Sequence, residues 1–191
     1  MLVSACSCDQ FQPALIASVP HHHTLSDLNC MITIRPAVID DTATLLDLIR
    51  GLAEYERLSH LVTATQASLQ DALFGPQPGA EALLAFEGEI AIGFAVFFHN
   101  FSTFLGKRGL WLEDIFVRPE HRRKGYGQAL FLHVVRIAHE RGCGRFEWSA
   151  LDWNEPAIRF YKSMGAAALD DWTIFRVAGE ALERLALQRG T

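Results

Sequence analysis

Residues 112–130 read LEDIFVRPEHRRKGYGQAL, and this stretch decides the fold. The apolar run at 115–117 is followed by Arg118-Pro119, and because proline cannot donate to a sheet ladder, a strand is expected to stop there. A basic loop that contains glycine comes next. After it, apolar residues recur with a helical period from Ala129 to Ala138. The sequence therefore predicts a strand, a loop and a helix in that order.

The loop and the first turn of that helix have the chemistry of a phosphate site. The first amides of a helix have no partner inside the helix and carry the positive end of its dipole. Gly125 and Gly127 let the backbone come close to a ligand, and Arg122, Arg123 and Lys124 add positive charge. The sequence therefore predicts a binding site for a phosphate or pyrophosphate.

These residues resemble the GCN5-related N-acetyltransferase (GNAT) family. Arg122-x-x-Gly125-x-Gly127 matches the loop that holds the pyrophosphate of acetyl-coenzyme A (acetyl-CoA) in that family. Two further stretches, LEDIFV at 112–117 and DWNEPAIRFYK at 152–162, resemble its diamine branch, which acts on spermidine, spermine or thialysine. The resemblance implies an α/β fold, in which helices flank a mixed, mostly antiparallel central sheet with a splayed central strand.

The resemblance also implies an acetyl-CoA-dependent N-acetyltransferase that acts by direct attack on a small cationic amine. The acceptor would be a polyamine, a diamine or a lysine-like amino acid. Tyr161 is the expected general acid for the leaving thiolate, since a phenol titrates at about 10. Glu113 is expected to contact the amine and draw off its proton, and Tyr55 and Glu56 match the family's substrate-site pair. The residues expected to bind the cofactor are Ile115, Phe116, Val117, Arg122, Arg123, Lys124, Gly125, Tyr126, Gly127, Gln128, Asn154, Ala157 and Tyr161.

Purely structural roles stay open for several of these residues. Tyr161 could place its ring in the core and its hydroxyl at the rim. Tyr55 and Glu56 could form a surface helix end, and the cap role of Asn154 alone would explain an asparagine there. Asp114 follows Glu113 directly, so the two should point to opposite faces of a strand. A salt-bridged or solvent-facing Asp114 is as well supported as a catalytic one.

Composition narrows the functional class. The chain has 191 residues, which suits one domain, and a net charge of −5, whereas a general nucleic-acid binder would more often be basic. No apolar run is long enough to span a bilayer. The four cysteines include no C-x-x-C pair, which argues against a zinc site and favours a cytoplasmic setting. We therefore expect a small-molecule amine as partner, with no nucleic acid, membrane or metal.

The hydrophobic pattern predicts the elements in order. Strands are expected at 32–35, 82–86, 90–98, 110–117, 146–151 and 172–177, with an aromatic loop at 99–109. Helices are expected from Asp40 or Asp41 to about Tyr55, at 65–73, at 125–141, from Asn154 to near Gly165, and at 180–187. Residues 1–30 are expected to be a poorly ordered or dispensable extension before an acetyltransferase domain at 31–191. A homodimer is expected by resemblance, with the strand at 172–177 near the partner.

Two other functions compete with a small-amine acetyltransferase. The same fold could acetylate a protein or peptide amine, or it could bind coenzyme A without catalysis. Arg123 and Lys124 replace a small residue and an aromatic one that are common in the diamine branch, which leaves the acceptor open. A dinucleotide site of the Rossmann type is disfavoured, because Leu130 occupies the position of its third glycine.

Overall fold

The computed structural model describes residues 32–188, so the predictions for residues 1–30 and for Met31 as a natural start lie outside it. The described chain divides into two compact units, one ending at Trp148 and the other beginning at Ser149. The elements are β1 (Thr33–Pro36), η1 (Ile39–Asp41), α2 (Thr42–Tyr55), η2 (Ser59–Leu61), α3 (Gln66–Phe74), β2 (Glu81–Glu87), β3 (Ile90–Ser102), β4 (Lys107–Val117), η3 (Pro119–His121), α4 (Tyr126–Glu140), β5 (Phe146–Trp148), α5 (Glu155–Ser163) and α6 (Glu180–Ala186).

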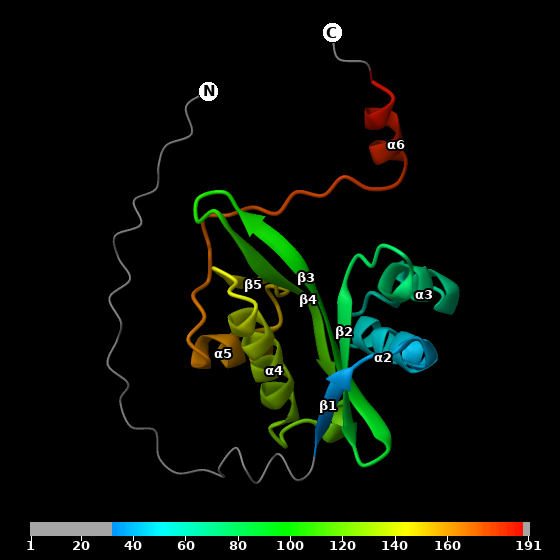
Figure 1. Ribbon diagram of the computed structural model, residues 1–191, viewed down its shortest axis with the longest axis vertical. Helices are drawn as coiled ribbons and strands as arrows, with labels where there is room; N and C mark the ends of the chain where they lie inside the picture. The colour runs from blue at the N-terminus through cyan, green and yellow to red at the C-terminus, as the bar shows by residue number, and fades with distance from the viewer. Residues whose placement is uncertain (1–31, 189–191) are drawn as a thin grey trace. The chain divides into compact units, whose positions relative to one another are not determined.

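The first unit is built on a five-stranded sheet with the strand order β1-β2-β3-β4-β5. Strands β1 to β4 are antiparallel to their neighbours, and β5 lies parallel to β4. Helices α2 and α3 cover one face of the sheet and α4 covers the other (Figure 1). The mixed, mostly antiparallel sheet flanked by helices is therefore confirmed.

The core under α2 explains why this helix docks on the sheet. Leu45, Leu48 and Leu52 recur at helical spacing and are buried. They pack in one cluster with Phe94 of β3 and Phe116 of β4, whose ring centroids lie 6.3 Å apart. Burial of such side chains stabilises the fold by about 1.5–3 kcal/mol each, so the α2 face holds a large share of the stability of this unit.

Strand β4 has a bulge at Glu113 and separates from β5 there. Val96 of β3 opposes Asp114, whereas the next residue, Phe97, opposes Leu112, so Glu113 is the extra residue. Pairing with β5 ends at Leu112 with Trp148 as its partner. Within the described chain, no strand lies beside residues 113–117 on that edge. The splayed central strand is thus confirmed, and its exposed backbone edge is available to a ligand.

Two predicted boundaries are wrong in ways that the pairing explains. Residues 99–109 are not an aromatic loop, because β3 continues to Ser102 and β4 begins at Lys107. The aromatic residues there favour a strand as much as a pocket lining. The strand predicted at 146–151 ends at Trp148, since β4, its neighbour in the sheet formed by residues 32–188, separates from it at the bulge.

The strand predicted at 172–177 is absent from the described part of the chain. Trp172, Ile174 and Phe175 are 75%, 70% and 90% exposed, and no strand in residues 32–188 pairs with this segment. The aromatic and β-branched composition that suggested a strand stabilises one only when a neighbouring strand provides hydrogen bonds and a packing surface.

The helices of the second unit follow their predicted boundaries closely. Asn154 caps α5, because its side-chain oxygen accepts a hydrogen bond from the backbone amide of Ala157 at 3.4 Å. Pro156 lies in the first turn of α5, where its missing amide proton costs nothing. Helix α6 matches the closing helix predicted at 180–187.

Candidate active site

The loop before α4 has the backbone shape that a phosphate site needs. After η3, Arg123 and Gly125 adopt positive φ angles of 61° and 80°, and Gly125 is the N-cap of α4. Among the described residues, no side chain caps this helix end. The amides of the first turn are therefore directed outward together with the positive end of the helix dipole. An anion is the natural ligand for this site.

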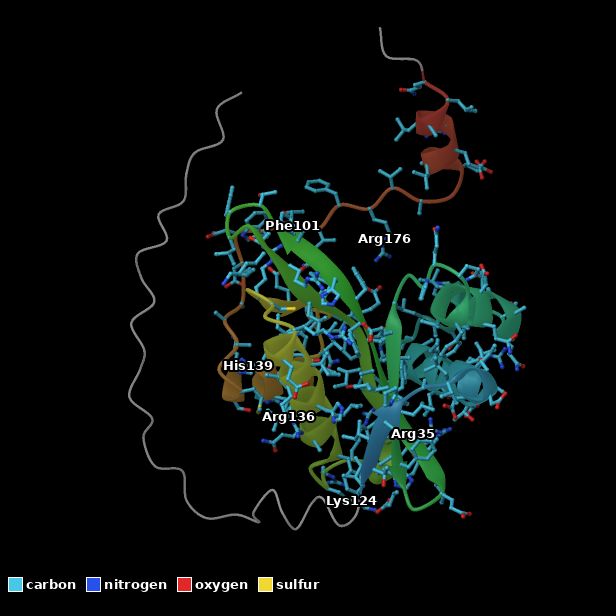
Figure 2. All side chains as sticks on the ribbon, in the orientation of Figure 1. Arg35, Phe101, Lys124, Arg136, His139 and Arg176 are labelled. Carbon is cyan, nitrogen blue, oxygen red and sulfur yellow. The ribbon has the colours of Figure 1, made fainter. Side chains whose placement is uncertain are left out.

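Glu87 at the end of β2 anchors this loop. Its carboxylate accepts hydrogen bonds from the Tyr126 hydroxyl at 2.5 Å and from Lys124 Nζ at 3.0 Å, and it contacts His121 Nδ1 at 2.5 Å. The hydrogen bonds from Tyr126 and Lys124 lower the pKa of Glu87 to about 2. Burial and the Glu87 carboxylate raise the pKa of Tyr126 to about 12. Figure 2 shows Lys124 at the loop before α4.

These contacts limit which atoms of the predicted loop residues can bind a cofactor. The Tyr126 side chain is only 1% exposed, so only its backbone can face a ligand. Lys124 is held by Glu87, although its side chain is 44% exposed. Gly127 and Gln128 lie in the first turn of α4, as predicted.

The two arginines of the loop have different surroundings. Arg122 donates from Nε to the carbonyl oxygen of Val117 at 2.8 Å, and its guanidinium carbon lies 4.3 Å from the Tyr55 ring centroid. Arg123 is exposed, and no ion pair or hydrogen bond among residues 32–188 uses its guanidinium. Arg123 is therefore the better placed of the two to meet a phosphate.

In the strand that was predicted to bind the cofactor, the side chains pack against the protein and the backbone is left to contact a ligand. Phe116 and Val117 are 4% and 7% exposed, and Phe116 belongs to the core under α2. Ile115, between Asp114 and Phe116, is half-buried. All three lie on the part of β4 that has separated from β5, so their main chain rather than their side chains faces the open edge.

Three carboxylates gather where β4 bulges and α2 ends. Asp114 shares the α2 face of the sheet with Phe116, because their β3 partners Val96 and Phe94 both pack on the core of that face. Burial, with repulsion from Glu113 and then Glu56, raises the pKa of Asp114 to about 6. Burial also raises the pKa of Glu56. This acidic cluster of Glu56, Glu113 and Asp114 suits a cationic ligand.

The remaining contacts of these residues link the cluster to its surroundings. Glu113 is exposed and accepts a hydrogen bond from Trp111 Nε1 at 3.0 Å. Tyr55 is the last residue of α2 and Glu56 is its C-cap, so both occupy the helix end that the sequence predicted. A salt-bridged or solvent-facing Asp114 and a catalytic one are predicted equally well by the sequence; in the structure Asp114 is half-buried, and its raised pKa makes it a candidate for a role in the site.

Three predicted site residues lie in the second unit. Asn154 is the N-cap of α5, and the backbone amide of Ala157 binds its side chain. Tyr161 lies in the last half of α5, is half-buried, and has its ring centroid 5.3 Å from that of Phe160. The capping role of Asn154 is confirmed, while the catalytic role of Tyr161 stays a prediction.

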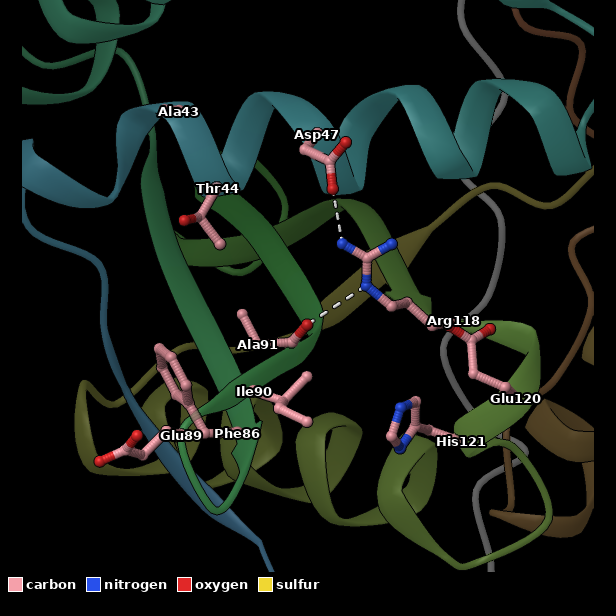
Figure 3. Close-up of a pocket in the computed structure, with 10 residues that line it drawn as sticks. All are labelled: Ala43, Thr44, Asp47, Phe86, Glu89, Ile90, Ala91, Arg118, Glu120 and His121. Carbon is pink, nitrogen blue, oxygen red and sulfur yellow. Dashed lines mark hydrogen bonds and ion pairs between the residues drawn. The ribbon is translucent and has the colours of Figure 1, made fainter.

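A separate pocket of about 660 Å³ opens beside α2 and contains none of the predicted site residues (Figure 3). Arg118 reaches across it, with Nη2 2.5 Å from Asp47 and Nε 3.2 Å from the carbonyl oxygen of Ala91. The other residues that line the pocket are Ala43, Thr44, Phe86, Glu89, Ile90, Glu120 and His121. Arg118 thus ties the end of β4 to α2 and to the start of β3, which fixes the start of the phosphate loop.

No group of three or more His, Cys, Asp or Glu residues that could hold a metal ion is found in residues 32–188. None of the helices described is both long enough and apolar enough to cross a membrane.

Comparison with known proteins decides the family. The profile of the acetyltransferase (GNAT) family matches residues 45–166, which includes the bulged strand, the phosphate loop and α5. The chain belongs to the GNAT acetyltransferase family. A thialysine N-epsilon-acetyltransferase from Sus scrofa is 36% identical over 166 residues, which cover 81% of this chain and 97% of that protein.

Two further matches agree with this assignment. An L-ornithine N5-acetyltransferase from Arabidopsis thaliana is 32% identical over 198 residues, covering 80% of this chain and 86% of that protein. An integron cassette protein from the mobile metagenome of V. cholerae, a solved structure, is 26% identical with a TM-score of 0.71 and covers 83% of this chain and 99% of its own. This acetyltransferase therefore has the GNAT fold and is an N-acetyltransferase.

Two residues of this acetyltransferase were missed by the sequence reasoning. Glu87 lies 34 to 39 positions before its partners in the loop, and the register of the sheet brings it to them. Arg118 was used only to mark the end of a strand. For Asp114, the acidic pair Glu113-Asp114 was a signal, but the bulge that turns Asp114 toward α2 cannot be read from the sequence.

Proposed function

We propose that this acetyltransferase transfers the acetyl group of acetyl-CoA to a primary amine of a small cationic acceptor. Lysine-like and ornithine-like amino acids, diamines and polyamines are the acceptor class. The observation that carries the proposal is the acidic cluster of Glu56, Glu113 and Asp114 at the bulge of β4. The names of the relatives, which describe thialysine and ornithine acetyltransferases, support the same class.

The charge of the cluster favours such an acceptor over a neutral one. A half-buried carboxyl whose pKa is raised to about 6 is unfavourably charged at neutral pH. A cationic nitrogen beside Asp114 removes that penalty, because an opposite charge stabilises the ionised form. The acceptor and the carboxylates therefore stabilise each other, and acceptors without a cation lose this contribution.

The donor side of the reaction follows from the loop. GNAT acetyltransferases use acetyl-CoA as cosubstrate, and we assign its pyrophosphate to the amides that follow Gly125, with Arg123 adding charge. The acyl arm would then follow the open edge of β4 from Val117 toward Glu113, where main-chain groups have no neighbouring strand in the described chain. This direction brings the thioester toward the acidic cluster.

The chemical step then needs three proton transfers, because the acceptor nitrogen loses two protons and the leaving thiolate gains one. The acceptor ammonium loses a proton to Glu113 or Asp114, and a raised pKa near the working pH suits Asp114 to that role. The neutral nitrogen attacks the thioester carbonyl and the C–N bond forms. As the C–S bond breaks, the nitrogen loses its second proton, which balances the proton that the leaving thiolate takes up. We propose that Tyr161 gives its proton to the leaving thiolate, on the strength of its place in the RFYK sequence of α5.

A thiol-release assay with acetyl-CoA tests this function. The acceptor panel is thialysine, L-ornithine, L-lysine, putrescine, spermidine and a peptide with one free lysine, and mass spectrometry identifies the acetylated nitrogen. The proposal expects turnover of at least one small amine with a kcat/KM well above that of the peptide. Faster turnover of the peptide would establish the protein-acetylating alternative instead. Binding of coenzyme A without turnover of any amine would establish a non-catalytic module.

A further inference from the structure

Arg122 joins two parts of the site that the proposed function treats separately. Its backbone belongs to the phosphate loop, yet its guanidinium carbon lies 4.3 Å from the ring centroid of Tyr55 at the end of α2. It also lies 5.5 Å from the ring centroid of Phe116. Tyr55 is the residue immediately before Glu56 of the acidic cluster. One half-buried side chain therefore connects the donor loop with the acceptor side.

We propose that Arg122 is a positioning residue that couples acetyl-CoA binding to acceptor binding, rather than a phosphate ligand. The proposal rests on the proposed function. A phosphate-binding arginine presents its N–H groups to the anion. In this structure Nε of Arg122 donates to the Val117 carbonyl oxygen at 2.8 Å, and the guanidinium carbon lies over the Tyr55 ring, 4.3 Å from its centroid.

The contacts of Arg122 provide a route for coupling. When a pyrophosphate fixes the backbone of the loop, the stem of Arg122 is fixed with it. The guanidinium then holds the Tyr55 ring from one side, while its hydrogen bond to Val117 holds the end of the strand along which the acyl arm runs. Binding of acetyl-CoA thus orders Tyr55 before the amine arrives. Amine binding then no longer carries the entropy cost of ordering Tyr55, so the amine binds more tightly.

The neighbouring residue provides a matched control. Arg123 has an exposed guanidinium with no ion pair among the described residues, so it is expected to contribute to phosphate binding alone. Thermodynamic linkage makes the distinction measurable, since coupling must be reciprocal: the amine must tighten coenzyme A binding by the same factor by which coenzyme A tightens amine binding.

The experiment measures the Kd of coenzyme A by calorimetry, without thialysine and with thialysine raised until the isotherm no longer changes. Coenzyme A carries no acetyl group, so no turnover interferes. The wild-type protein is expected to bind coenzyme A about fivefold or more tightly when thialysine is present. Arg122→Gln and Tyr55→Leu are each expected to bring this ratio to about one, and the double variant to add nothing further.

Arg123→Gln is expected to weaken coenzyme A binding under both conditions and to leave the ratio at its wild-type value. A wild-type ratio of one, or an Arg122→Gln variant that retains the wild-type ratio, overturns the proposal. Thermal melts check that each variant folds, and if Arg122→Gln does not fold, Tyr55→Leu alone decides by the same criterion. The thiol-release assay separates the two claims: turnover with a ratio of one refutes only the coupling, whereas absent turnover refutes the proposed function.

Discussion

Replacement of Asp114 by asparagine should stabilise this acetyltransferase at alkaline pH and weaken its catalysis. Asp114 is half-buried beside Glu113 and Glu56, and its pKa rises from 3.8 to about 6 in the folded protein. Because the folded-state pKa lies above the unfolded one, protonated Asp114 favours folding below about pH 4. That contribution is lost as the pH rises through about 6. At pH 8 the charge should therefore cost up to about 3 kcal/mol, which Asp114→Asn removes.

The assay is urea denaturation at pH 8 and at pH 4. Asp114→Asn is expected to be more stable than the wild type by up to about 3 kcal/mol at pH 8, or about 2–4 °C in Tm for each kcal/mol. The gain should nearly vanish at pH 4, where the Asp114 carboxyl of the folded protein is protonated and therefore neutral, like asparagine. Asp170→Asn, at an exposed carboxylate, is the control and should change neither value by more than about 0.5 kcal/mol. An equal difference at both pH values, or a less stable variant at pH 8, would refute this reasoning.

Further substitutions test the loop and the general acid. Glu87→Gln should raise the KM for acetyl-CoA by roughly tenfold with little change in the amine KM, because two charge-assisted contacts that hold the loop are weakened. Glu89→Gln, in the turn of the same hairpin, should leave both KM values unchanged, and steady-state kinetics compares the two. Tyr161→Phe should lower kcat by roughly a hundredfold or more while coenzyme A binding, measured by calorimetry, stays the same. Unchanged turnover would remove Tyr161 from the mechanism.

Much of the fold is predictable because local signals agree with one another. The apolar run before Pro119, the glycines of the loop and the helical period after them predict the end of β4, the loop and both ends of α4 within one residue. Thr65 and Asn154 mark the starts of α3 and α5, since each caps its helix through its own side chain. Such signals act over three or four residues, so one sequence is enough to read them.

The features that were missed depend on contacts between distant residues. The bulge at Glu113 turns Asp114 toward α2, and it is set by the register of β4 against β3. Glu87 reaches the loop only because β2 ends beside it. The segment at 172–177 has the composition of a strand but has no partner strand among the residues described. The homodimer expected near that segment, like the cytoplasmic location, stays a prediction.

The most direct test of the central claim compares acceptors that share one reactive amine but differ in a second positive charge. L-ornithine is paired with 5-aminopentanoic acid, and putrescine with butylamine. If the acidic cluster selects cations, kcat/KM should favour the doubly aminated member of at least one pair by about tenfold or more, as expected for about 1.4 kcal/mol of charge interaction. Glu56→Gln should reduce that preference. Equal kcat/KM values within both pairs would contradict the account.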